Sequence, residues 1–190
     1  MQIKHKYTGK VLFELECENI KTLVEEAVKA KVGLIGANLR YIDLEGADLE
    51  GVNFKDANLK DADLRGTNLK DAILTGANLA DVDLMGANLK NANLTDANLE
   101  GADLIGANLE DVRVWNTIGN MREVRSMQIE TYTITFTKDL LHIGCIGFPI
   151  EKWKNMSDED VSRLSYKALK LWHKWKDFIF TAIDLSFPTD

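Results

Sequence analysis

The chain has 190 residues and contains few of the residues that cross-link or interrupt a fold. Its two cysteines, Cys17 and Cys145, lie far apart, which excludes a disulfide scaffold and favours reduced thiols in a cytoplasmic protein. The two prolines, Pro149 and Pro188, both lie toward the C-terminus. No run of about 18 apolar residues and no charged-then-apolar leader occurs, so we expect neither a membrane-spanning helix nor a secretory signal.

Signs of catalysis are also scarce. The sequence has no phosphate-binding loop, no dinucleotide fingerprint and no G-x-S-x-G nucleophile elbow. His142 and Cys145 are three residues apart in a predicted strand, where they would point to opposite faces, and His173 lies on a predicted helix. This arrangement argues against a zinc site or a Cys–His pair. We therefore expect no enzymatic activity, no bound metal and no cofactor.

Acidic residues outnumber basic ones, and the excess lies in one region. The whole chain has a net charge of −7. Residues 33–114 hold 7 Lys+Arg and 15 Asp+Glu, whereas residues 1–32 hold 6 and 5 and residues 115–190 hold 10 and 10. An acidic chain of this kind is not expected to bind nucleic acid directly, so the expected partners are proteins.

A bulky apolar residue recurs at every fifth position through the middle of the chain. The series has sixteen members: Leu39, Leu44, Leu49, Phe54, Leu59, Leu64, Leu69, Leu74, Leu79, Leu84, Leu89, Leu94, Leu99, Leu104, Leu109 and Val114. A smaller apolar or β-branched residue stands two positions before each one, usually with Asn or Asp between them. A period of five fits neither a helix nor a strand. It is typical of a solenoid, in which each short unit buries its apolar pair only against its neighbours.

The two flanking segments differ from the repeats and predict three domains. Residues 1–32 predict a strand–helix cap, with a strand at 10–17, a helical face at 20–28 and a capping-box spacing of Thr22 and Glu25. Residues 33–114 form the solenoid. Residues 115–190 predict a small α+β module, with strands at 130–137 and 140–146 and one long helix that starts at Ser157.

The repeats resemble the pentapeptide-repeat family, whose consensus is A-(D/N)-L-x-x. This resemblance implies a mainly β fold, a right-handed quadrilateral β-helix in which four units make one square turn. Sixteen units would then form about four coils, and residues twenty positions apart would stack on the same face. The complete fold is expected to be this solenoid with an α/β N-terminal cap and the α+β C-terminal module.

Such stacking would place the residues before each central leucine on four faces, one of which carries only aspartates: Asp43, Asp63, Asp83 and Asp103. Carboxylates about 5 Å apart repel each other by roughly 0.8 kcal/mol per pair in water, a cost that asparagine avoids. Two hypotheses stay open. The acidic row could imitate DNA phosphates and occupy a basic groove, as family members that inhibit gyrase and topoisomerase are understood to do. Alternatively, Asp and Asn are interchangeable because both bond to the local backbone.

Three of these aspartates are followed, two residues later, by Arg65, Met85 and Ile105. The face is therefore expected to become apolar toward its C-terminal coils, which favours a partner contact there. No insertion interrupts the repeats, unlike the inserted loop that the resemblance implies for gyrase-binding members. The candidate partner-binding residues are Asp43, Asp63, Asp83, Asp103, Met85 and Ile105.

The predicted C-terminal helix carries more aromatic residues than one packing face requires. We expect these residues either to pack on the preceding strands or to form a homodimer or partner surface. They are Trp172, Trp175, Phe178 and Phe180.

The flanking segments resemble the ends of pentapeptide-repeat proteins from tailed phages and prophages, through the strand–helix start and the segments at 118–123 and 143–145. This resemblance implies a phage-encoded protein in the cytoplasm of a bacterial host. The expected function is a non-enzymatic protein-binding module that inhibits or decoys a host nucleic-acid-handling or defence protein, through the acidic surface, the C-terminal module or both. The alternative is a structural or assembly scaffold with no inhibitory role.

Overall fold

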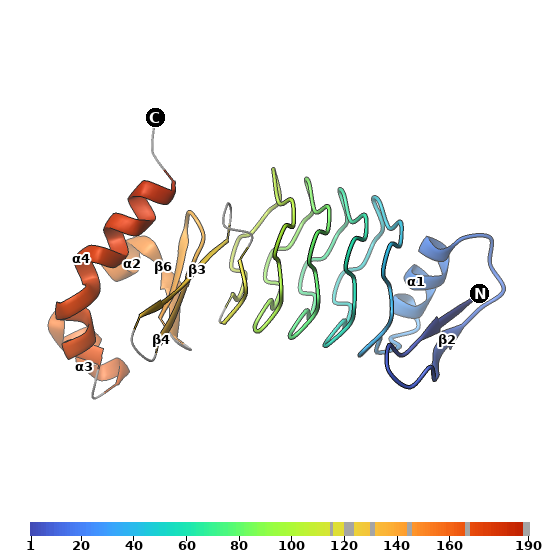
Figure 1. Ribbon diagram of the computed structural model, residues 1–190, viewed down its shortest axis with the longest axis horizontal. Coiled ribbons are helices and arrows are strands. Elements are labelled where there is room, and N and C mark those ends of the chain that lie inside the picture. The colour runs from blue at the N-terminus through green and yellow to red at the C-terminus, as the bar shows by residue number, and fades with distance from the viewer. Residues whose placement is uncertain (115, 120–123, 130–131, 144–145, 166–167, 188–190) are drawn as a thin grey trace.

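The chain forms a central stack of coils with a different structure at each end (Figure 1). The computed structural model describes all residues except 115, 120–123, 130–131, 144–145, 166–167 and 188–190. Strands β1 (Gln2–Lys4) and β2 (Val11–Glu14) and helix α1 (Ile20–Lys29) lie at the N-terminal end of the stack. A four-stranded sheet and three helices lie at the opposite end.

Backbone pairing between residues twenty positions apart holds the coils together. Asn38 pairs with Asn58 in parallel, Asn58 pairs with Asn78, and the other faces follow the same rule. Each rung is closed by hydrogen bonds such as those from Leu39 N to Asn58 O and from Asn58 N to Ala37 O, both 2.8 Å long. This ladder pattern is that of a quadrilateral β-helix, which explains why a period of five could not be a helix or an ordinary strand.

The coils turn at the residue two positions after each central apolar residue. The backbone φ is positive at every one of these corners, from Tyr41 (58°) to Asn116 (53°). Gly, Asn and Asp tolerate this left-handed conformation best, and they occupy all the corners except Tyr41. Six aspartates of the solenoid are therefore explained by backbone geometry: Asp56, Asp61, Asp71, Asp81, Asp96 and Asp111.

The interior of the stack is a column of fully buried apolar side chains, including Leu44, Leu64 and Leu84. The repeat also continues one unit beyond the predicted end at Val114, because Ile118 pairs with Asn98. The sequence did not predict this unit because Gly119 stands where the bulky central residue is usual.

The N-terminal end of the solenoid is closed by backbone and side-chain hydrogen bonds. The predicted strand is confined to β2, which pairs antiparallel with the unpredicted β1. Beside β1, the Asn38 amide donates to Lys4 O (2.8 Å). Helix α1 places Leu23, Val24 and Ala27 in the same core as the coils.

The predicted capping box of α1 was wrong. The N-cap is Asn19, whose side chain accepts a hydrogen bond from Thr22 N at 2.8 Å, so Thr22 lies inside the first turn. Asparagine is a strong N-cap because its short side chain reaches the free amides at a helix start.

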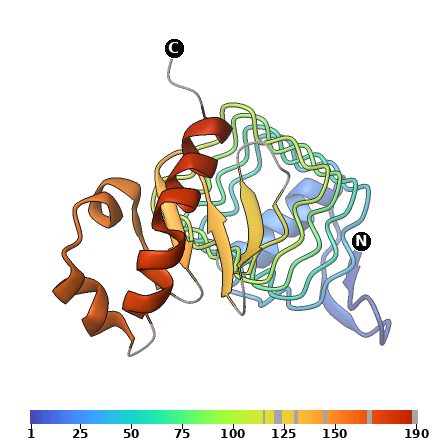
Figure 2. The same ribbon diagram turned by 60° about the vertical axis from the view of Figure 1, so that its left-hand side comes forward.

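The C-terminal segment is an antiparallel sheet covered by helices. The strands β3 (Arg125–Ile129), β4 (Tyr132–Phe136), β5 (Leu140–Ile143) and β6 (Ile146–Pro149) pair in sequence order. Helices α2 (Ile150–Lys154), α3 (Asp158–Leu164) and α4 (Ala168–Ser186) follow. Figure 2 shows α4 running across the sheet on the side away from the coils.

The single long helix predicted from Ser157 was also wrong. Ser157 does cap a helix, through a capping box with Asp160. That helix, α3, ends at Leu164, because the next residue, Ser165, has an extended backbone (φ −165°). None of the helices in the described residues is long and apolar enough to cross a bilayer.

The two faces of the sheet belong to two cores. Ile134, Phe136 and Leu141 pack with the helices, whereas Leu140 joins the core of the solenoid. The sheet therefore links the last coil to the helical layer.

Candidate interaction surfaces

The aspartate face, which we define as Asp43, Asp63, Asp83 and Asp103 with Met85 and Ile105, is brought together by the coils. The four aspartates pair in sequence along one ladder. Each carboxylate also accepts a hydrogen bond from the backbone amide two residues ahead, as in the bonds of 3.0 Å from Met85 N to Asp83 and from Ile105 N to Asp103. The acidic side chains therefore have a local backbone role as well as a charge.

Asparagines at the equivalent place on other faces make the same local bond and add a second one. Asn88 Nδ2 donates to Asn68 Oδ1, and Asn108 Nδ2 donates to Asn88 Oδ1, both at 3.2 Å. A carboxylate cannot donate, so the aspartates gain no such bond between coils. On this count alone, asparagine would stabilise the stack more than aspartate does.

Arg65 neutralises the centre of the aspartate face. Its Nε lies 2.9 Å and 3.0 Å from the two carboxylate oxygens of Asp63, and its guanidinium also contacts Glu45 at 3.0 Å and Asp83 at 3.7 Å. The hydrogen bonds from Arg65 hold the pKa of the Asp63 carboxyl below its usual range. Among the described residues, neither Asp43 nor Asp103 forms an ion pair. The uncompensated charge therefore lies toward the two ends of the row.

Apolar side chains stand beside the C-terminal end of this row. Met85 is 37% exposed and Ile105 is 55% exposed. Ile105 follows Asp103 by two residues, so a carboxylate that forms no ion pair in the described part of the chain lies beside an exposed apolar side chain. This pairing distinguishes the surface from a uniform row of phosphates.

The aromatic residues of α4 divide between core and surface. Trp172 is 2% exposed and lies between Trp153 and Phe180, at ring distances of 5.3 Å and 5.7 Å. Of the two expectations for this residue, packing in the core is therefore confirmed and a place on a partner surface is not, because the rings of Trp153 and Phe180 lie against it. Trp175 and Phe180 are half-buried, whereas Phe178 is 53% exposed.

A second exposed apolar residue of α4, Leu185 (79% exposed), was not singled out from the sequence. It follows Phe178 by seven residues, which places both on one side of the helix. Helical spacing alone could have identified it, but the sequence does not show which side of α4 meets the sheet.

The histidines do not converge on a metal or catalytic site. His142 packs over Gly147 in the next strand, and burial lowers the pKa of its imidazole. Its Nδ1 and the neighbouring Thr135 Oγ1 have no hydrogen-bond partner among the residues that the structure describes. Cys145 lies outside the described residues, and His173 contacts Asp158 at 2.9 Å on the surface. The described residues contain no cluster of three His, Cys, Asp or Glu side chains suited to a metal ion.

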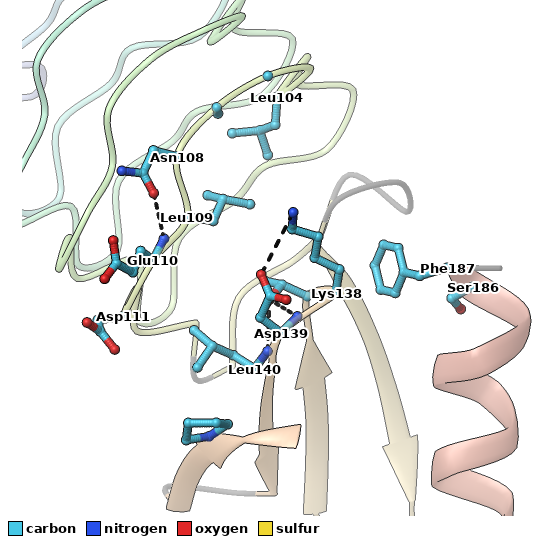
Figure 3. Close-up of a pocket in the computed structure, with 14 residues that line it drawn as sticks. Leu104, Asn108, Leu109, Glu110, Asp111, Lys138, Asp139, Leu140, Ser186 and Phe187 are labelled. Carbon is cyan, nitrogen blue, oxygen red and sulfur yellow. Dashed lines mark hydrogen bonds and ion pairs between the residues drawn. The ribbon is translucent and has the colours of Figure 1, made fainter. Parts of the chain in front are cut away.

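A cleft of about 710 Å³ lies where the last coil meets the C-terminal sheet (Figure 3). Leu109 and Asp111 line it from the solenoid, Asp139 and Leu140 line it from the sheet, and Phe187 lies just after α4. The cleft joins segments far apart in sequence, so the repeat pattern carried no signal for it.

Comparison with known proteins identifies the repeated segment. The family model described as pentapeptide repeats matches residues 34–71 and 72–111. No curated protein matches the chain.

Three solved structures illustrate the likeness. Rfr23, a pentapeptide repeat protein from the cyanobacterium Cyanothece 51142, is 38% identical over 44% of this chain and 60% of its own, with a TM-score of 0.35. The pentapeptide repeat protein alr5209 from Nostoc PCC 7120 is 37% identical over 50% of this chain and 78% of its own (TM-score 0.35). QnrB1, a plasmid-mediated fluoroquinolone resistance protein, is 20% identical over 47% of each chain (TM-score 0.40). The chain thus spans less than two thirds of the length of Rfr23 and of QnrB1.

Proposed function

Because residues 34–71 and 72–111 place this chain in the pentapeptide-repeat family, we propose that it is a non-enzymatic protein-binding module that uses the outer surface of its coils. The aspartate face is the proposed contact surface. The observation that carries this proposal is the carboxylate of Asp103, which has no ion-pair partner among the described residues, beside the exposed side chain of Ile105. A matching partner surface would combine lysine or arginine with apolar side chains.

The more specific part of the proposal concerns the partner. A basic, DNA-binding groove of a bacterial nucleic-acid-handling or defence protein would suit carboxylates spaced by about 4.8 Å along the coils. The chain would then act as a phage-encoded inhibitor or decoy in the host cytoplasm. Because Arg65 neutralises Asp63 and lies 3.7 Å from Asp83, the strongest contact is proposed at Asp103 rather than along the whole face.

Two features of the molecule favour other roles for the same surfaces. The local hydrogen bonds of the aspartates suit a structural or assembly scaffold, in which Asp and Asn are interchangeable. In the C-terminal module, the exposed pair of Phe178 and Leu185 is the proposed homodimer or partner surface.

The test is a pull-down from bacterial lysate at low and moderate salt, with three forms of the full chain compared side by side. The first is the native chain and the second changes the four aspartates of the face to asparagine. Asparagine accepts the same backbone hydrogen bond, so this variant is expected to stay folded. The corner control removes three charges from corners that do not border this face: Asp56→Asn, Asp71→Asn and Asp96→Asn.

The expected result is a partner that the native chain and the corner control retain, that the face variant loses, and that salt weakens. If all three forms retain the partner equally, the aspartate face is not the contact surface. The surface formed by Phe178 and Leu185 would then be the candidate. Unfolding of the face variant, measured by circular dichroism, would show that the aspartates are structural. If none of the three forms retains a partner, the result would favour the structural or assembly scaffold.

A further inference from the structure

The last coil of the solenoid ends in an unpaired backbone edge. On this face, Leu89 N donates to Asn108 O and Asn91 N donates to Glu110 O, both at 2.9 Å, which closes the preceding rung. The equivalent groups one coil later are Leu109 N, Asp111 N and Ala107 O. Within the described part of the chain these three groups, which we call the open edge, have no hydrogen-bond partner.

The solenoid core is also uncovered at the open edge. Ala107 and Leu109 are half-buried, whereas their equivalents in the coil below, Ala87 and Leu89, are completely buried. On the adjacent face, Leu104 is only 1% exposed. The C-terminal segment therefore leaves the apolar pair of this one face accessible to solvent.

The open edge forms one wall of the cleft in Figure 3. The opposite wall carries Leu140 and Phe187, and the volume of about 710 Å³ lies within the range of known ligand sites, roughly 300–1,000 Å³. A strand that entered the cleft would find apolar side chains on both sides and unpaired hydrogen-bonding groups along one side. These are the conditions in which an extended peptide adds a strand to a sheet.

The charges of the cleft indicate what the strand should carry. Asp111 has no ion-pair partner among the described residues, and Asp139 lies nearby on the sheet wall. Lys138 is the cation in the lining and pairs weakly with Asp139, at 4.0 Å. A segment with lysine or arginine next to its apolar residue would complement these carboxylates.

We propose that the cleft binds an extended, cationic segment of a partner protein, which forms one further rung on the solenoid. Stacking over the last coil requires a small residue above Ala107, a polar residue above Asn108 and a leucine-like residue above Leu109, followed by lysine or arginine. The two amides of the open edge are two residues apart, which is the spacing that a partner strand satisfies and a compact small molecule does not. These residues are separate from the aspartate face, so the proposal does not depend on the proposed function.

The test uses a synthetic peptide of two consecutive Ala-Asn-Leu-Lys-Gly units with a fluorescent label, and the full-length protein. Without peptide, the amides of Leu109 and Asp111 should exchange with deuterium much faster than those of Leu89 and Asn91. Peptide should raise the fluorescence anisotropy and slow exchange at Leu109 and Asp111. The same peptide N-methylated on its backbone should bind much more weakly, because it cannot donate to Ala107 O.

Matched variants separate the cleft from general charge effects. Asp111→Asn keeps a residue that tolerates the left-handed corner and should weaken binding about two- to fivefold, the range for an exposed charge pair. Asp71→Asn makes the same change at the same corner position two coils away and should leave binding unchanged.

Protection of Leu109 and Asp111 in the free protein would overturn the proposal, because the edge would already be closed. Binding that is insensitive to N-methylation, or equally weakened by both variants, would also overturn it. Retention of the lysate partner by the variant with all four aspartates of the face changed to asparagine, together with normal peptide binding, would reject the proposed function alone.

Discussion

The two ends of the solenoid are closed to different degrees. At the N-terminal end, Asn38 N bonds to strand β1, Asp48 N donates to Glu25 Oε1 at 3.1 Å, and Lys21 Nζ donates to Glu45 O at 2.8 Å. At the C-terminal end, the sheet contributes Leu140 to the solenoid core but leaves Leu109 half-exposed. The segments at each end of a repeat stack must therefore provide hydrogen-bond partners for its last backbone groups. Where some of these groups have no partner, the end of the stack is an edge that can bind another strand.

The largest difference between the ends should be in core packing. Leu44→Ala removes a fully buried side chain from the first coil and should lower the free energy of unfolding by about 2–5 kcal/mol. Leu109→Ala removes a half-buried one from the open end and should cost roughly 1–2 kcal/mol. Urea denaturation followed by circular dichroism measures both. Equal losses would mean that the open end is as well packed as the closed end.

A smaller effect should follow from weakening the cap itself. Asn19→Ala removes the N-cap of α1 and should destabilise the closed end by about 1 kcal/mol. Thr22→Ala is the control, since Thr22 contributes its backbone amide to the cap and this amide is retained. Thermal and urea unfolding of the two variants provide the comparison. A larger loss of stability with Thr22→Ala than with Asn19→Ala would instead support Thr22 as the N-cap.

The smallest expected effect on stability is the difference between two aspartates of the aspartate face. Asp103→Asn should stabilise the protein by up to about 0.8 kcal/mol, because it removes repulsion from Asp83 and adds an amide donor. Asp63→Asn loses the pairing with Arg65 and should cost less than about 1 kcal/mol at neutral pH. Urea unfolding near pH 7 should show opposite signs, and the same sign for both would mean that Arg65 does not distinguish them.

The pH dependence of the same pair gives an independent check. Hydrogen bonds from Arg65 hold the pKa of Asp63 below 3.8 in the folded state, so its contribution is fully present above pH 3.8 and is lost as the pH falls through the lowered value. The difference in unfolding free energy between the native chain and Asp63→Asn should therefore shrink in acid. A difference that is constant with pH would show that the ion pair adds nothing to stability.

The sequence predicted the repeats better than the segments around them. Each unit contains its own apolar pair and its own corner residue, so the period of five indicated both the stacking and the aspartate row. The flanks lack such repetition, and β1, β3, β6 and α2 were missed. These elements depend on pairing or packing with distant segments, which local pattern does not show. Trp172 illustrates the limit, since its burial depends on Trp153 in another helix.

The sequence by itself determined the coils, because neighbours twenty residues apart repeat the same apolar, hydrogen-bonding and turn-forming residues. It also determined which residues share the aspartate face. Only the tertiary structure decided that Arg65 neutralises the centre of that face, that Trp172 is internal, and that the last coil is left open beside Leu140 and Phe187. The physical reason is that these features depend on how side chains and end elements meet in space, whereas the coil is specified by each unit in turn.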